Sequence, residues 1–178
     1  MELRTPRLLL RGWREEDVAP FARINADPEV MRYVGVPLDR SETQAYVAEI
    51  RRHWAERGYG LWAVERLDEG RLIGCLGLGH HRWYPGEVEL GWRLEQGSWN
   101  RGLATEAATA ALEDAFARVG LDRLITVIHR DNAASRRVAE KCGFRLEKEE
   151  ARVYERTGET LPIVVYGRSR PSSGPGRP

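Results

Sequence analysis

The sequence has few of the features that indicate a disulfide framework, a membrane anchor or a secreted protein. Among 178 residues there are only two cysteines, Cys75 and Cys142, which lie far apart and form no CxxC pair. We therefore expect two buried thiols in a reducing cytoplasm. No apolar run approaches the length of a membrane span, and charges interrupt the apolar residues of the opening segment, MELRTPRLLLR. We expect a soluble cytoplasmic protein with no membrane partner.

A basic excess is also absent. The chain has 28 Lys and Arg residues against 27 Asp and Glu residues, which leaves a net charge of +1, whereas nucleic-acid-binding proteins usually carry a marked basic excess. A hydrophobic share of 42% and a charged share of 31% are typical of a globular protein. A chain of this length can bury a stable core without disulfides or bound metals. We predict no nucleic-acid partner, one domain over residues 1–168, and a disordered tail over residues 169–178, which are rich in Pro, Gly and Ser.

Several ligand motifs are missing as well. His53 and His129 stand alone, and no group of His, Cys, Asp and Glu has the spacing of metal ligands, so we predict no metal. The Walker pattern GxxxxGK[ST] does not occur. The segment GCLGLG, residues 74–79, reads GxxGxG rather than GxGxxG and precedes no helix, so we interpret it as a glycine-rich strand or bulge.

The pattern of apolar residues predicts a mixed α/β or α+β fold. Helical spacing predicts four helices, the second with Ser41 as its N-cap: residues 14–27, 41–58, 103–119 and a last one from Asp131 or Asn132 to 143. Apolar alternation and short apolar runs predict strands at residues 7–13, 59–66, 71–83, 86–95, 122–130, 144–156 and 161–169. A crossover helix separates the fourth and fifth strands, which should therefore be parallel. We predict a mostly antiparallel sheet of six to seven strands flanked by about four helices.

The segment SWNRGLATEA, residues 98–107, predicts an anion site. The first N–H groups of a helix have no partner within the helix and carry a partial positive charge. Gly102 allows a ligand to approach the backbone closely, and Arg101 adds a charged hydrogen-bond donor. The small side chains of Ala104 and Ala107 leave room for a ligand to approach the start of the helix. Together these features favour a phosphate group.

The hexapeptide WNRGLA, residues 99–104, resembles the [QR]-x-x-G-x-[GA] loop of the GNAT superfamily of N-acetyltransferases, which holds the pyrophosphate of acetyl-coenzyme A. Three blocks are similar, in matched order, to the branch that includes the RimJ and RimL ribosomal-protein N-terminal acetyltransferases: LRTPRLLLR…REEDVAPFARINADPEVMRYVG, VELGWRLEQGSWNRGLATEA and VIHRDNAASRRVAEKCGF. The resemblance covers about residues 3–150. It implies a GNAT-like fold, acetyl-CoA as cosubstrate, and acetyl transfer to a primary amine by direct attack with a tetrahedral intermediate.

The chain departs from the family pattern at four positions. Trp99 stands where many members have Gln or Arg, although Trp is common in this branch, and Asn100 replaces a frequent Gly. The Tyr that many members use as general acid, seven residues after the Asn of the last helix motif, is Ala139 here. The Glu that some members place five residues before that Asn is Val127 here. A non-catalytic module that senses coenzyme A is therefore the alternative to an enzyme.

The resemblance assigns a set of cofactor-binding residues. It implies that the backbone of residues 92–94 pairs with the pantetheine arm and that a strand N–H polarises the thioester carbonyl. Asn132 has two interpretations, a helix cap or a contact to the pantetheine or pyrophosphate arm. The full cofactor-binding set is Trp92, Arg93, Leu94, Trp99, Asn100, Arg101, Gly102, Leu103, Ala104, Thr105, Asn132 and Ser135.

Three residues are candidates for proton transfer. Glu89, on the polar face of its strand, is the candidate base, acting directly or through water; the alternative is a solvated carboxylate or one paired with Arg93 on the same face. His81 is the second candidate, because the pKa of histidine suits proton transfer near neutrality. Ser135 is the candidate donor to the departing sulfur in place of the missing Tyr.

The acceptor amine is not defined by the sequence. Five aromatic residues line a groove or belong to the core: Tyr33, Trp54, Trp62, Trp83 and Tyr84. The branch favours the N-terminal amine of a protein, and a small amine, an amino acid or an antibiotic ranks close behind. Both a monomer and a homodimer are compatible with the sequence.

Overall fold

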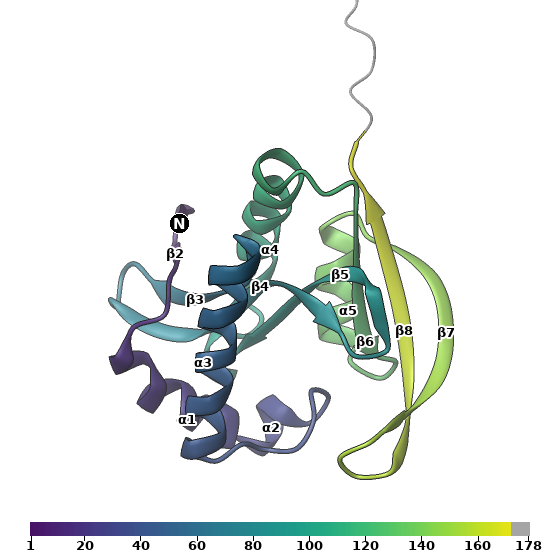
Figure 1. Ribbon diagram of the computed structural model, residues 1–178, viewed down its shortest axis with the longest axis horizontal. Helices are drawn as coiled ribbons and strands as arrows, with labels where there is room; N and C mark the ends of the chain where they lie inside the picture. The colour runs from purple at the N-terminus through teal and green to yellow at the C-terminus, as the bar shows by residue number, and fades with distance from the viewer. Residues whose placement is uncertain (172–178) are drawn as a thin grey trace, which may run out of the picture.

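The computed structural model describes residues 1–171, and residues 172–178, which make up most of the predicted tail, lie outside the described residues. Within residues 1–171 one sheet has the strand order β1-β2-β3-β4-β5-β6-β8-β7, with α-helices on both faces (Figure 1). The strands are β1 Leu3–Arg4, β2 Leu8–Arg11, β3 Leu61–Arg66, β4 Arg71–His81, β5 Tyr84–Leu94, β6 Arg123–His129, β7 Arg145–Tyr154 and β8 Glu159–Ser169. The helices are α1 Val18–Ala26, α2 Pro28–Met31, α3 Arg40–Arg57, α4 Leu103–Asp114 and α5 Ala133–Lys141.

The predicted class, a mixed and mostly antiparallel α/β fold, is confirmed. The described sheet has one strand more than predicted, since β1 is only two residues long and depends on pairing with β2 rather than on a pattern of its own. Helix α2, where the sequence DPEVMRYVG predicts a helical turn and break, is a single turn that follows Asp27, whose side chain accepts from the N–H of Glu29. None of the helices within residues 1–171 is both long and apolar enough to cross a membrane.

The N-cap predicted for α3 was wrong by two residues. Asp39 rather than Ser41 caps the helix, because its carboxylate accepts from the N–H of Glu42 at 2.8 Å while Glu42 accepts from the N–H of Asp39 at 2.8 Å. This reciprocal capping box satisfies two donors at once. Ser41 lies inside the helix, and its hydroxyl donates to Asp39. The predicted end at Gly58 is confirmed, with a left-handed φ of 73°.

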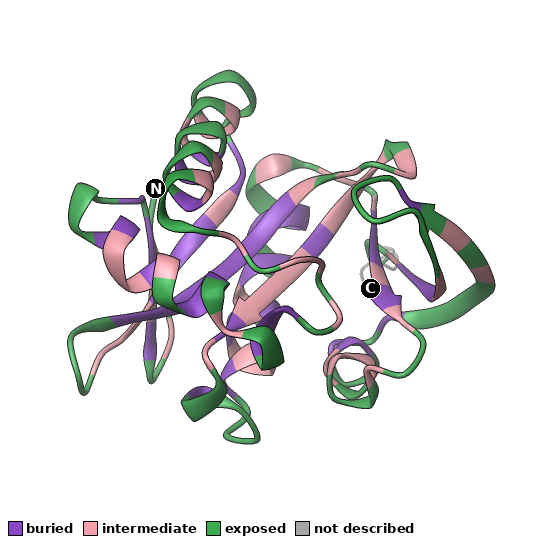
Figure 2. Ribbon diagram, turned by 90° about the horizontal axis from the view of Figure 1, so that it is seen from below, coloured by how far each residue is buried: buried purple, intermediate pink, exposed green. Residues whose placement is uncertain are grey.

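The two larger of three hydrophobic clusters within residues 1–171 lie on the two faces of the sheet, and the central strands between them are the most buried part of the molecule (Figure 2). On one face α1 and α3 pack on β3 and β4 through Phe21, Val47, Ile50, Ala63 and Cys75. On the other face α4 and α5 pack on the sheet through Leu76, Leu90, Leu94, Ala107, Ala108, Ala111 and Ala139. The apolar side chains of β5 thus lie on the face that α4 covers.

The glycine-rich segment of β4 is a strand, as predicted. Gly74 and Gly77 have φ values of 149° and 154°, and a β-carbon would overlap the carbonyl of Arg93 on β5 at Gly74 and the carbonyl of Gly60, just before β3, at Gly77. Pairing between β3 and β4 slips between Val64 and Glu65, opposite Gly74, which marks a bulge. These two glycines therefore allow the neighbouring backbone to approach closely.

The parallel pairing of β5 with β6 is also confirmed, and it is short. Glu89 pairs with Ile125, and beyond this point the two strands diverge (Figure 1). The crossover between them is α4, which continues as a π-helical turn at Ala115–Val119 and ends at Gly120 with a φ of 81°. The divergence exposes the open edge of β5 to a groove.

Candidate functional site

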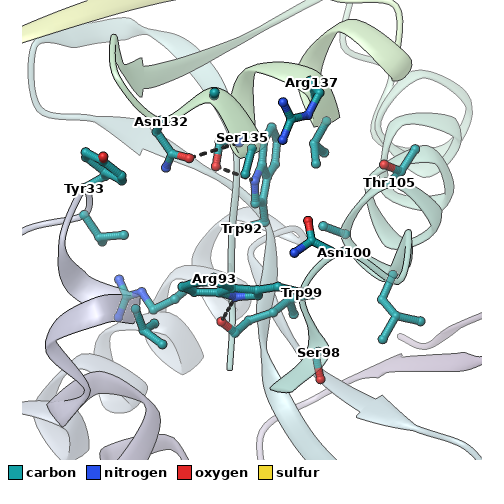
Figure 3. A pocket seen from close by; sticks show the side chains of 18 of the residues that line it. Tyr33, Trp92, Arg93, Ser98, Trp99, Asn100, Thr105, Asn132, Ser135 and Arg137 are labelled. Atoms are coloured by element: carbon teal, nitrogen blue, oxygen red, sulfur yellow. Dashed lines mark hydrogen bonds between the residues drawn. The ribbon is translucent and has the colours of Figure 1, made fainter. Parts of the chain in front are cut away.

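A groove of about 490 Å³ lies where β5 leaves β6. Its walls are the end of β5, the segment that leads into α4, and the first turns of α4 and α5 (Figure 3). The structure brings eleven of the twelve predicted cofactor residues to this groove: Trp92, Arg93, Leu94, Trp99, Asn100, Gly102, Leu103, Ala104, Thr105, Asn132 and Ser135. The twelfth, Arg101, lies elsewhere.

The N-terminus of α4 forms one end of the groove. Gly102 is the N-cap, with a left-handed φ of 75°, and no described side chain caps the helix. The first N–H groups of the helix, at Leu103, Ala104 and Thr105, therefore remain available to a ligand. Asn100, which occupies a frequent glycine position of the family loop, has a φ of 58°, a conformation that Asn tolerates better than most residues. The helix end at Gly102 thus has the N–H groups on which the predicted anion site depends, and anion binding there stays a prediction.

The cations near this helix end differ from the prediction. Arg101 lines a separate hollow with Arg4 and Arg7, and its carbonyl accepts from Arg7 Nη1 at 2.9 Å. Arg137 and Lys141, on the exposed surface of α5, line the groove instead. Because they are four residues apart on a helix, they share one face. That spacing was the available signal, but only the tertiary structure shows that this face meets the groove.

The start of α4 is braced by the N-terminal segment of the chain. Glu106 accepts from Thr5 Oγ1 at 2.6 Å, from the N–H of Arg7 at 2.9 Å and from Arg7 Nε at 2.6 Å. Partial burial opposes ionisation, but these hydrogen bonds prevail and lower the pKa of Glu106. The carboxylate therefore fixes the start of α4, and its negative charge also interacts favourably with the positive end of the helix dipole.

The open edge of β5 presents backbone groups to the groove. Glu95 donates its N–H to Ile73 of β4 at 2.8 Å. Backbone hydrogen-bonding direction alternates along a strand. The backbone N–H and C=O of Arg93 therefore also face β4, whereas those of Trp92 and Leu94 face the groove. The carbonyl of Leu94 accepts from Trp99 Nε1 at 2.8 Å. The indole of Trp99 thus anchors the loop to the strand.

Asn132 and Ser135 connect the first turn of α5 to β5. The capping interpretation of Asn132 is confirmed, because its Oδ1 accepts from the N–H of Ser135 at 3.1 Å. Trp92 Nε1 donates to Ser135 Oγ at 3.3 Å, as the dashed lines in Figure 3 show. Ala139 is fully buried in the core. Ser135 lies one turn before Ala139 on the same helix face, and its hydroxyl reaches the groove.

A second cavity of about 310 Å³ continues from the groove and contains the candidate bases Glu89 and His81. The residues that line both spaces include Tyr33, Trp92, Arg93, Asn132 and Ser135. A molecule bound along the groove would therefore place its end beside the second cavity. We refer to the second space as the acceptor cavity.

Glu89 is half-buried, and its Oε1 accepts from the N–H of Val127 on β6 at 3.1 Å. Burial raises the pKa of Glu89 to about 7, although the Val127 hydrogen bond and the charge of Arg82 oppose the shift. The alternative ion pair with Arg93 is wrong, because Arg93 Nη1 donates to Asn25 Oδ1 at 2.6 Å instead. A carboxylate that ionises near neutral pH suits a general base.

His81 lies in the same cavity but is a weaker base. Burial and the neighbouring charge of Arg82 lower the pKa of His81 to about 4, so its imidazole is neutral at physiological pH. Its Nδ1 accepts from the N–H of Trp83 at 3.3 Å. Near neutrality Glu89 is closer than His81 to the ideal pKa of a base.

The five aromatic residues divide between the core and the site. Tyr33 lines both the groove and the acceptor cavity and packs against His129 with 5.0 Å between ring centroids. Trp83 also lines the acceptor cavity. Trp62 is fully buried, Trp54 packs against it, and the hydroxyl of Tyr84 donates to Glu150. Sequence reasoning missed Tyr46, which lines the acceptor cavity from α3.

Comparisons with known proteins agree with this geometry. The family model described as an acetyltransferase (GNAT) domain matches residues 7–145. The chain is 33% identical to the uncharacterized protein YkkB of Bacillus subtilis, over 94% of this chain and 95% of that protein. It is similar to a crystal structure of an acetyltransferase from Agrobacterium tumefaciens, with 30% identity, a TM-score of 0.82 and coverage of 96% of this chain and 95% of that one.

A further solved structure shares the fold. The RimL ribosomal L7/L12 alpha-N-protein acetyltransferase, in complex with coenzyme A, has 18% identity, a TM-score of 0.80 and coverage of 95% of this chain and 98% of that one. At this identity the likeness concerns the fold alone. Placement of this chain in the RimJ and RimL branch stays a prediction.

Proposed function

This chain belongs to the GNAT family of acetyltransferases and takes its acetyl group from acetyl-CoA, and we propose that it transfers that group to a primary amine by direct attack on the thioester. The acceptor is a protein N-terminus or a small amine. One observation carries the proposal: the open end of α4 and the open edge of β5 line a groove that shares lining residues with the acceptor cavity, which contains the carboxyl group of Glu89.

The end of the groove at α4 suits the diphosphate of the donor. The free N–H groups of Leu103, Ala104 and Thr105 would donate to phosphate oxygens, and Arg137 and Lys141 would add positive charge. Each charge interaction with a helix end contributes only about 0.3–1 kcal/mol, so several donors must act together.

The edge of β5 suits the pantetheine arm and the thioester. The peptide groups of Trp92 and the N–H of Leu94 face the groove and can pair with the amides of the arm, as a further strand would, whereas the carbonyl of Leu94 already accepts from Trp99. The N–H of Trp92 is the donor we assign to the thioester carbonyl. In the tetrahedral intermediate the carbonyl oxygen becomes an anion. The hydrogen bond from Trp92 is therefore stronger in the transition state than in the bound substrate.

We assign Glu89 to proton transfer from the amine and Ser135 to the stabilisation of the leaving sulfur. Ionised Glu89 takes a proton from the amine, directly or through water, while the amine nitrogen bonds to the carbonyl carbon. The carbon–sulfur bond then breaks, and the sulfur leaves as a thiolate. Because Ser135 Oγ already accepts from Trp92, its hydroxyl hydrogen is free to point at that sulfur.

A direct assay tests this function. Release of free coenzyme A thiol is followed with acetyl-CoA and a panel of N-terminal peptides, amino acids, polyamines and aminoglycosides. We expect turnover with at least one class and micromolar binding of coenzyme A by calorimetry, of the order typical for enzyme substrates. Tight binding of coenzyme A with no turnover on any amine would instead support the sensor alternative.

A further inference from the structure

The acceptor cavity contains a guanidinium group that no described carboxylate neutralises. Arg93 lines the cavity, and one of its N–H groups donates to Asn25 Oδ1 at 2.6 Å. Its Nε is buried and has no partner among the described residues. A guanidinium has five N–H donors, so most of them are left to other partners. A partly buried cation without a counter-charge is unfavourable, which makes its presence beside a cavity informative.

Contacts with two helices hold Arg93 in place. Asn25, on α1, is fully buried, and its amide nitrogen donates to Thr43 Oγ1 on α3 at 3.1 Å. The guanidinium carbon lies 5.9 Å from the ring centre of Phe21 and 5.7 Å from that of Tyr46. Both are cation–π distances, which favour a fixed guanidinium over a freely solvated one. Arg93 is therefore oriented before any ligand arrives.

The charges around the acceptor cavity are predominantly positive. Among its lining residues Glu89 is the single carboxylate, whereas Arg82 and Arg93 are both cationic. An acceptor with several ammonium groups would leave all but one of them without a carboxylate and close to guanidinium groups. The charge pattern therefore disfavours polyamines and aminoglycosides.

We propose that the acceptor carries a carboxylate in addition to its amine, and that this carboxylate pairs with Arg93 while the amine lies toward Glu89. The inference rests on the acetyl transfer proposed above. Glu89 and Arg93 share one face of β5 and are four residues apart, or about 13 Å along the strand. The amine and the carboxylate of the acceptor therefore need not sit on one carbon. An amino acid and a peptide N-terminus with a nearby acidic side chain share this chemistry.

The test uses acceptors in matched pairs, one member with a carboxylate and the other with an amide. In one series amino acids are compared with their amides. In the other, peptides that begin Ser-Asp or Ser-Glu are compared with peptides that begin Ser-Asn or Ser-Gln. In at least one series we expect a preference in kcat/KM of about 10- to 100-fold for the carboxylate. The series that shows it identifies the source of the carboxylate.

Variants then connect the preference to Arg93. The substitution Arg93→Gln should remove the preference, Arg93→Lys should restore part of it, and Arg40→Gln, at the exposed start of α3, should retain it. Calorimetry with coenzyme A shows whether each variant is folded and binds the donor. Equal turnover of carboxylates and amides by the unaltered protein would overturn the inference but leave the proposed function intact. Turnover of no amine at all would overturn both.

Discussion

Trp92 Nε1 and Ser135 Oγ lie 3.3 Å apart, and this hydrogen bond ties β5 to the first turn of α5 across the groove. The indole can only donate, so the serine oxygen must accept. The contact fixes the hydroxyl at the point where the groove meets the acceptor cavity, and it leaves the hydroxyl hydrogen free. Two residues 43 positions apart in the sequence are thus brought into contact.

Replacement of Ser135 by Ala tests its assignment to the leaving group. We expect kcat to fall about tenfold or more, because the departing thiolate loses a hydrogen bond, while KM for acetyl-CoA changes little. Steady-state kinetics at saturating acceptor measures the effect. Ser135→Thr keeps a hydroxyl and should retain more activity than the Ala variant. Equal loss in both variants would point to packing rather than to hydrogen bonding.

The pH–rate profile tests Glu89 as the base. Because burial raises the pKa of Glu89 to about 7, kcat/KM of the unaltered protein should rise as the pH passes through 7. In Glu89→Gln the rate should fall most above pH 7, where the native carboxylate is ionised, and the rise should disappear. Glu87→Gln, on the same face of β5, is the control. If the Gln variant kept the same rise, another group would be the base.

The same substitution should change stability with a defined sign. Folding raises the pKa of Glu89 from 4.5 to about 7, so between these values the unfolded chain releases a proton that the folded chain keeps. Stability therefore decreases as the pH rises from 4.5 to 7, and the cost is complete above 7. The free energy of unfolding of Glu89→Gln should exceed that of the unaltered protein by about 1–3 kcal/mol at pH 8 and by almost nothing near pH 4.5. Urea unfolding at the two pH values measures the difference, and an equal gain at both would exclude a titration effect.

Gly102→Val tests the helix end as the diphosphate site. Gly102 has a φ of 75°, a conformation that a β-branched residue rarely adopts, so the N–H groups after it should shift. We expect the affinity for coenzyme A, measured by calorimetry, to fall at least about tenfold. The matched control is Gly120→Val, which follows the same helical segment with a φ of 81°. It should cost similar stability and leave the affinity unchanged; an equal loss of affinity in both variants would contradict the assignment.

The cations of α5 should matter more than the cation of the loop. Arg137→Gln and Lys141→Gln should each weaken binding of coenzyme A about 3- to 10-fold, and less so at high salt, because both residues line the groove at the surface. Arg101→Gln should have little effect, since this side chain lines a different hollow. The affinity of each variant for coenzyme A is measured at two salt concentrations. A larger loss of affinity in Arg101→Gln than in the α5 variants would contradict the structural placement.

Local chemistry in the sequence was enough to predict much of the fold and the open helix end at Gly102, and the family resemblance supplied most of the residues that line the groove. Apolar periodicity predicts the main helices and strands, because one face of each must be buried. A glycine followed by small residues at the start of a helix predicts the anion site at Gly102, because the free N–H groups there follow from helix geometry itself. The signal is local, so it survives without knowledge of the tertiary structure.

The rest was decided by the tertiary structure, because it depends on distances between residues remote in sequence. Only the packing of α5 against β5 brings Arg137 to the groove while Arg101 faces elsewhere. Glu89 acquires a pKa near 7 only because β6 and the residues around the acceptor cavity remove it from water. Likewise, only folding pairs Arg93 with Asn25 and leaves it without a carboxylate partner among residues 1–171. Burial and pairing are properties of the assembled chain, and no local pattern contains them.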